Sequence, residues 1–227
     1  MIGDNLFSIR NEIAEAGRRF NRDLKDVQLL AVSKTRPIVD IMTAVEYGQY
    51  RFGESYLQEA IEKIRALKDY SLEWHFIGSL QSNKTRLIAC NFDWVQSVDK
   101  VKYVQHLNRQ RPTHLAPLNV CIQVNISEEP QKAGVSLGDL LPLVNEVLEL
   151  PRLRFRGLMT LPARCSDFVE QRRAFHKLYV VYKKLQDSGI VLDTLSMGMT
   201  NDMVAAIAEG ATLVRVGTGI FGQRLSN

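Results

Sequence analysis

The sequence contains few cysteines. Three occur among its 227 residues, Cys90, Cys121 and Cys165, and they form no CxxC pair and no metal-binding spacing with the four histidines. A low and odd number of cysteines is typical of a protein kept in a reducing compartment, and it argues against a disulfide scaffold or a structural zinc site. We therefore expect a cytoplasmic protein.

Long apolar segments are also missing. The first twenty residues lack the continuous apolar core of a signal peptide, and no segment approaches the length of a membrane span. The chain has no low-complexity tract and no Gly- or Pro-rich linker. We expect one domain over residues 1–227 that does not bind a membrane.

A strong charge of one sign is lacking as well. The chain carries 29 Lys and Arg against 25 Asp and Glu, a net charge of +4, and the basic residues are scattered. The densest pairs, Arg172-Arg173 and Lys183-Lys184, lie on one expected amphipathic helix, where a solvated face is the simpler interpretation. Because no aromatic-rich basic motif accompanies them, we expect no nucleic-acid partner. No long exposed apolar patch is evident, which favours a monomer.

Strand-like and helix-like segments alternate along the chain. An N-terminal helix, with Ile9, Ile13, Ala16 and Phe20 on one face, comes first. Strict alternation predicts a parallel sheet, and about eight such units predict a closed (β/α)8 TIM barrel of the α/β class with an extra N-terminal helix. An open doubly wound sheet is the alternative, but its GxGxxG fingerprint is absent. The expected strands span residues 27–34, 50–54, 73–78, 94–98, 119–126, 153–160, 193–199 and 212–217.

The carboxyl ends of barrel strands form the active face, so the residues there are the first candidates for a site. The first strand delivers Lys34, although lysine is rarely buried without a partner. The segments SMGMTND and VGTGIFG follow the last two strands, where barrels often hold a phosphate. Glycine amides and hydroxyls suit an anion, which predicts a phosphate cup. The cup would comprise Ser196, the Met197 amide, Gly217 and Thr218, with Thr200 or Asn201 capping the next helix.

A lysine and a phosphate cup together point to one cofactor. Desolvation disfavours the ammonium form of a lysine, so that Lys34 could attack an aldehyde and form a Schiff base. The combination predicts a pocket for pyridoxal 5′-phosphate (PLP). Arg215, in the last strand, would face the pyridine nitrogen, which such sites pair with Asp or Arg. Purely structural roles are the alternatives: the glycines would form turns, the hydroxyl would cap a helix, and Arg215 would form a structural ion pair.

Five segments carry a family resemblance: LLAVSKTRP, RFGESYLQEA, EWHFIGSLQSNK, RGLM and SMGMTNDMVAAIAEGATLVRVGTGIFG. In order and spacing, over nearly the whole chain, they resemble the pyridoxal phosphate homeostasis proteins. The resemblance implies an alanine racemase N-terminal barrel (fold type III) with a Lys34 Schiff base to PLP. It also implies Arg215 at the ring nitrogen, Ser196, Gly217 and Thr218 around the phosphate, and a role in vitamin B6 and amino-acid homeostasis.

The second-strand motif departs from the family pattern. The family usually has FGEN, whereas this chain has FGES, which places Ser55 where an asparagine would lie near the ring hydroxyl of the cofactor. Serine is shorter and would reach that hydroxyl through a water. The usual SMGMS is SMGMT here, which keeps the hydroxyl group.

Three functions remain open from the sequence. The first is a non-catalytic PLP carrier that supplies apo-forms of PLP-dependent enzymes. The second is a PLP-dependent amino-acid racemase of low activity that uses Lys34 and a second group such as His75, although a core histidine bonded to a neighbour is the commoner outcome. The third is an aldolase-like barrel for another phosphorylated metabolite. Glu59 is expected to be a surface helix residue.

Overall fold

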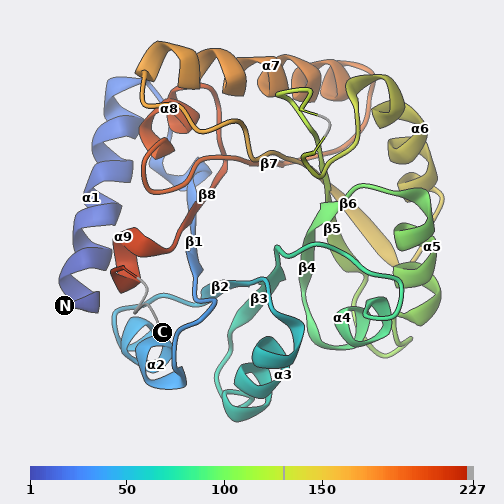
Figure 1. Cartoon of the computed structure of the whole chain (residues 1–227), viewed down its shortest axis with the longest axis horizontal. Coiled ribbons are helices and arrows are strands. Elements are labelled where there is room, and N and C mark those ends of the chain that lie inside the picture. The colour runs from blue at the N-terminus through green and yellow to red at the C-terminus, as the bar shows by residue number, and fades with distance from the viewer. Residues whose placement is uncertain (130, 224–227) are drawn as a thin grey trace.

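The chain folds into a closed parallel barrel. A computed structural model describes residues 1–129 and 131–223, with Leu24 described by its backbone alone. Eight strands follow one another around the barrel in chain order, and β1 closes it by pairing with β8 (Figure 1). Helices surround the strands on the outside (Figure 1). The predicted TIM barrel is therefore confirmed and the open sheet is excluded. A single domain over residues 1–227 stays a prediction, since residues 130 and 224–227 lie outside the described part.

All eight predicted strands are present, with ends that differ by at most three residues. The largest differences lie at carboxyl ends, where the chain leaves the sheet to form the site-bearing loops. Thr35, for example, has φ of 63°, a left-handed conformation that β-structure excludes. The strands are β1 Gln28–Val32, β2 Arg51–Glu54, β3 Glu73–Phe76, β4 Trp94–Val98, β5 Leu118–Gln123, β6 Leu153–Met159, β7 Thr194–Ser196 and β8 Leu213–Val216.

Amphipathic helices connect the strands and cover the barrel. Gly48, Gly189 and Gly210 follow the caps of three of them with φ of 74°, 89° and 92°, as expected for glycines that end helices. The helices are α1 Ile2–Arg19, η1 Leu24–Asp26, α2 Ile38–Glu46, α3 Leu57–Ala66, α4 Thr85–Asn91, α5 Val101–Gln110, α6 Leu137–Leu148, α7 Phe168–Asp187, α8 Met203–Ala208 and α9 Thr218–Phe221.

The extra N-terminal helix, α1, packs against the last two helices, α8 and α9. It lies beside α2, α8 and α9 (Figure 1). The Asn5 side chain donates a hydrogen bond to the Ile220 carbonyl at 2.8 Å, so α1 is fixed to the short helix α9 that follows β8. The predicted helix is thus confirmed, and it supports the loop after the last strand from outside the barrel.

Two apolar clusters fill the molecule. The large one lies between the strands and the helices and includes Leu6, Ile88 and Phe175 among its fully buried side chains. A small separate cluster joins Trp94, Cys121 and Met159 of three neighbouring strands. Cys121 is thus a core residue, and burial raises the pKa of its thiol to about 12. The inside of the barrel is therefore only partly apolar, and polar side chains occupy the rest.

Candidate functional site

Lys34 lies in the turn that follows β1. Its predecessor Ser33 is buried and extends the sheet pairing, since its N–H donates to the Gly53 carbonyl at 3.1 Å. The turn then closes through a bond from the Arg36 N–H to the Ser33 carbonyl at 3.0 Å. Lys34 itself is half-buried. The sequence prediction that the first strand delivers this lysine to the carboxyl end of the barrel is therefore confirmed.

A buried ion cluster holds the two neighbours of Lys34. The Lys63 ammonium, on α3, donates to the Ser33 carbonyl at 2.7 Å and to Glu54 Oε1 at 2.7 Å. It also pairs with Glu59, whose Oε1 accepts the Thr35 N–H at 2.6 Å. The residues before and after the candidate lysine are thus bonded to one cluster, which fixes the conformation of the turn.

Glu54 is the most deeply buried member of this cluster. Its side chain has no exposed surface and accepts a further bond from the Ser33 hydroxyl at 2.6 Å. Burial raises the pKa of Glu54, and the neighbouring Lys63 ammonium opposes that shift. Sequence reasoning missed Lys63, while Glu59 lies on α3 as expected, with a partly exposed side chain that pairs with Lys63. The i, i+4 spacing of Glu59 and Lys63 was the available signal.

Arg215 lies inside the barrel on β8. Its Nη1 donates to the Ser196 hydroxyl at 2.6 Å and its Nη2 donates to the Thr160 carbonyl at 2.8 Å. Both acceptors are neutral, so they orient the guanidinium without cancelling its charge. Burial lowers the pKa of Arg215 to about 10, which leaves the side chain charged at neutral pH. The interpretation of Arg215 as half of a structural ion pair is not supported by these contacts.

The loops after β7 and β8 meet at two threonines. The Thr200 and Thr218 hydroxyl oxygens lie 3.3 Å apart, and the Gly219 N–H donates to the Thr200 hydroxyl at 3.3 Å. A Cβ built on Gly217 would lie 3.3 Å from the Val32 carbonyl oxygen, so this loop lies directly against the end of β1. Thr218 of the predicted cup and Thr200 are thus gathered beside the strand that leads into Lys34.

Two predicted members of the cup face elsewhere. The Ser196 side chain is buried, and its hydroxyl donates to Gln96 at 2.6 Å while it accepts from Arg215. The Met197 amide, directly after β7, donates to the Leu213 carbonyl of β8 at 3.1 Å. Both groups therefore have hydrogen-bond partners within the protein.

The hydroxyl that does lie beside Thr218 belongs to Thr200, which the sequence analysis assigned only as a possible helix cap. Asp202 occupies the N-cap of α8 and accepts the Met199 N–H at 2.5 Å. The assignment of Thr200 or Asn201 to that cap was therefore wrong. The substitution of threonine for serine in SMGMT keeps a hydroxyl at this position and was the signal available for it.

Ser55 follows β2 directly and is half-buried. A Cβ built on Gly78 would lie 2.3 Å from the Ser55 carbonyl oxygen, so the loops after β2 and β3 pack closely. Around the barrel β2, β1, β8 and β7 are consecutive neighbours (Figure 1). Ser55, Lys34, Arg215 and the two threonines therefore occupy one continuous arc at the carboxyl ends of the strands.

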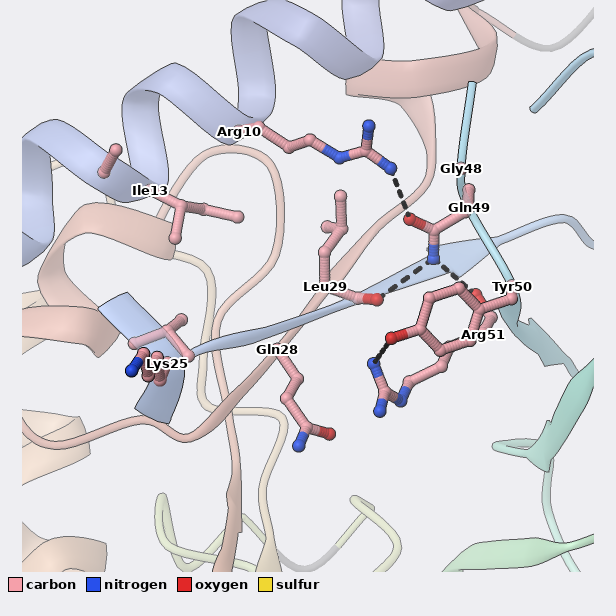
Figure 2. Close-up of a pocket in the computed structure, with 11 residues that line it drawn as sticks. Arg10, Ile13, Lys25, Gln28, Leu29, Gly48, Gln49, Tyr50 and Arg51 are labelled. Carbon is pink, nitrogen blue, oxygen red and sulfur yellow. Dashed lines mark hydrogen bonds between the residues drawn. The ribbon is translucent and has the colours of Figure 1, made fainter. Parts of the chain in front are cut away.

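A cavity of about 550 Å³ lies at the other end of the strands. Figure 2 shows Arg10 from α1 with Lys25, Gln28, Gln49 and Arg51, which lie before or at the start of β1 and β2. Its position separates it from the arc that carries Lys34. Within the described part of the chain, no three His, Cys, Asp or Glu side chains are grouped to hold a metal ion. The described helices also include none with the length and apolar character to cross a membrane.

Comparison with known proteins agrees with this geometry. Residues 5–225 match the family model of the alanine racemase N-terminal domain, the class of protein that the barrel and its strand-end lysine define. Within that class, a pyridoxal phosphate homeostasis protein of Escherichia coli K12 is 48% identical over 98% of this chain and 97% of its own length. A Haemophilus influenzae protein of the same name is 49% identical over 98% of this chain and 96% of its own.

A solved structure of PipY from Synechococcus elongatus, with PLP bound, has a TM-score of 0.86 and 36% sequence identity. The match covers 98% of this chain and all of PipY (100%). The chain belongs to the pyridoxal phosphate homeostasis protein family. The resemblance read from its five sequence segments is thereby confirmed.

Proposed function

We propose that this protein binds PLP and holds it as a Schiff base on Lys34, and that it serves intracellular vitamin B6 and amino-acid homeostasis. The observation that carries the proposal is the position of the β8 loop, whose Gly217 lies against the end of β1 that leads into Lys34. A lysine beside a hydroxyl-lined loop suits a ligand with an aldehyde at one end and a phosphate at the other. Family membership and the PLP-bound structure of PipY support the same ligand.

The residues present suit each part of such a ligand. Arg215 would face the ring nitrogen, and an arginine, which keeps its protons, would leave that nitrogen unprotonated and the ring a weak electron sink. Thr218, Gly217 and Thr200 would hold the phosphate, with Ser196 and Met197 supporting the pocket from the barrel interior. Lys34 would supply the amine that condenses with the aldehyde and releases one water. When bound, the cofactor supplies a reactive aldehyde and an electron-withdrawing ring.

We further propose a carrier and buffer of PLP, without catalytic turnover. Racemisation needs a second acid–base group over the cofactor, and His75 was the candidate from the sequence. Its ring is fully buried, stacks on Trp94 at 4.9 Å, and has both nitrogens in hydrogen bonds. The expectation of a bonded core histidine is confirmed, which disfavours the racemase. We propose a monomeric cytoplasmic protein whose partners are PLP and apo-forms of PLP-dependent enzymes.

The visible absorption spectrum tests the proposal. Purified protein incubated with PLP should show a visible band that borohydride bleaches and that Lys34→Ala removes, whereas Lys102→Ala on an exposed helix position should retain it. A wild type that takes up no PLP would refute the central claim and favour the aldolase-like alternative. Deuterium exchange at Cα, tested across the amino acids, separates carrier from enzyme. Exchange that depends on Lys34 would contradict the carrier.

A further inference from the structure

A single chain of hydrogen bonds crosses the interior of the barrel. Arg215 donates to Ser196 at 2.6 Å, and Ser196 donates to Gln96 Oε1 at 2.6 Å. Gln96 Nε2 lies 2.8 Å from His75 Nδ1, and His75 Nε2 lies 2.8 Å from Glu73 Oε1. The first four side chains are buried. Because β4 and β7 are not neighbours in the sheet, the contact between Gln96 and Ser196 must pass through the barrel.

The chemistry of the groups gives this chain one direction. A guanidinium can only donate, so the Ser196 oxygen must accept from Arg215 and its hydroxyl proton must point to Gln96. The Gln96 carbonyl is then the acceptor, which leaves its amide to donate to His75 Nδ1. That nitrogen must carry no proton, and the His75 proton therefore resides on Nε2 and is donated to Glu73. Burial lowers the pKa of His75, which agrees with a neutral ring.

The far end of the chain is firmly anchored. Glu73 also accepts a bond from Arg51 Nε at 3.0 Å, and the His75 ring is held flat against Trp94 with 11° between the ring planes. The interiors of such barrels are usually filled by bulky branched apolar residues. Burying polar side chains there costs desolvation free energy unless each of them is hydrogen-bonded. In this series of side chains, each one is hydrogen-bonded to the next. The arrangement holds the Arg215 guanidinium in one orientation.

We propose that Gln96 and His75 are positioning residues, which act through Ser196 to fix the guanidinium of Arg215 toward the bound ligand. Neither residue belongs to the arc that carries Lys34. Gln96 fixes the direction of the Ser196 hydroxyl, and that hydroxyl is one of the two acceptors that orient Arg215. The identity of the ligand rests on the proposed function, whereas the restraint on Arg215 is a property of the free protein.

The test compares Gln96→Leu with Gln49→Leu. Both glutamines are buried and bonded through their amides, but Gln49 lies at the opposite end of the strands (Figure 2). In the free protein, side-chain 15N NMR should resolve separate Nη1 and Nη2 signals for Arg215 in the wild type and in Gln49→Leu. Those signals should merge in Gln96→Leu, because the guanidinium rotates once Ser196 is released. The variant Arg215→Lys assigns the signals.

Binding provides the second measurement. Gln96→Leu should weaken PLP binding by roughly tenfold, the change expected for one hydrogen bond to a charged group, and should shift the visible band. In an Arg215→Met background the same substitution should have little further effect, since the two residues act as one unit. His75→Phe keeps an aromatic ring on Trp94 but removes the hydrogen bonds of the imidazole. It should therefore change the Arg215 NMR signals and the PLP affinity in the same direction as Gln96→Leu.

The outcomes are distinguishable. Resolved Arg215 signals in Gln96→Leu, equal to those of Gln49→Leu, would overturn the positioning role whatever the ligand is. Equal losses of PLP affinity in the two variants would overturn it as well, because the loss would then reflect general destabilisation. A wild type that takes up no PLP would refute the proposed function, and the NMR comparison on the free protein would still decide the role of Gln96.

Discussion

The Lys63 ammonium lies 2.7 Å from the carbonyl oxygen of Ser33, the residue that precedes Lys34. This contact joins the last turn of α3 to the end of β1, so a buried lysine supports the turn that carries Lys34. Lys63 has only 3% of its surface exposed. Its two carboxylate partners, Glu54 and Glu59, compensate its charge.

Removal of Lys63 should therefore destabilise the fold. Lys63→Met leaves the Glu54 carboxylate buried without its cation, a change that typically costs about 3–5 kcal/mol. The free energy of unfolding, measured by urea denaturation, should fall by that amount. The control is Lys68→Met, at an exposed position in the turn after α3, which should change the free energy of unfolding by less than about 0.5 kcal/mol. Equal stability of the two variants would contradict the support role of Lys63.

The threonine pair should contribute to the binding of the phosphate alone. Thr218→Val removes a hydroxyl from the loop after β8, and a hydrogen bond to a charged group contributes about 1.5–3 kcal/mol. The dissociation constant of PLP should rise by roughly tenfold or more, while that of pyridoxal, which lacks the phosphate, should stay unchanged. Thr200→Val should behave alike, and Thr43→Val on α2 is the control. Equal effects on both ligands would place the phosphate elsewhere.

Ser55 offers a substitution expected to improve binding. Ser55→Asn restores the residue usual in the family at a half-buried position next to β2. A direct hydrogen bond to the ring hydroxyl in place of one through water should lower the dissociation constant of PLP by roughly two- to tenfold. The control ligand is 3-deoxypyridoxal 5′-phosphate, which lacks the ring hydroxyl. Its dissociation constant should be the same for Ser55→Asn and the wild type. A gain with both ligands would exclude the ring hydroxyl as the cause.

His75 should make the stability of the protein depend on pH. Burial lowers the pKa of His75 from its ordinary value of 6.5. In the unfolded chain the ring takes up a proton near that value, whereas the folded protein does so only at lower pH. The unfolded state therefore binds more protons below pH 6.5, and the free energy of unfolding should decrease as the pH falls through this range. Above pH 6.5 the contribution is fully present.

Urea denaturation at about pH 7.5 and about pH 5.5 measures this dependence. His75→Gln removes the titrating ring, so the loss of stability between the two values should be smaller in the variant than in the wild type. Exchange of the exposed His114 for Gln is the matched control. A wild-type slope in His75→Gln would assign the dependence to other groups.

The sequence by itself determined the architecture and most of the arc. Alternating strand and helix patterns predicted eight parallel strands, because each apolar run is bounded by polar helices of the right length. The positions of Lys34, Ser55, Arg215 and Thr218 at or near the carboxyl ends of strands predicted that they belong to the site, because the parallel strands of a barrel all end at one face. The family resemblance, carried by the same segments, implied the same barrel and the same site residues.

Only the tertiary structure decided which side chains meet. Alternation along a strand indicates the face of a residue, but the register and tilt of the strands set its partners across the barrel. Ser196 and Gln96 are 100 positions apart in the chain and nevertheless share a hydrogen bond, so Ser196 faces Arg215 rather than the cup. Thr200 lies beside Thr218, and Lys63 lies under the Lys34 turn, for the same reason: closure of the barrel brings together residues whose distance along the sequence carries no sign of the contact.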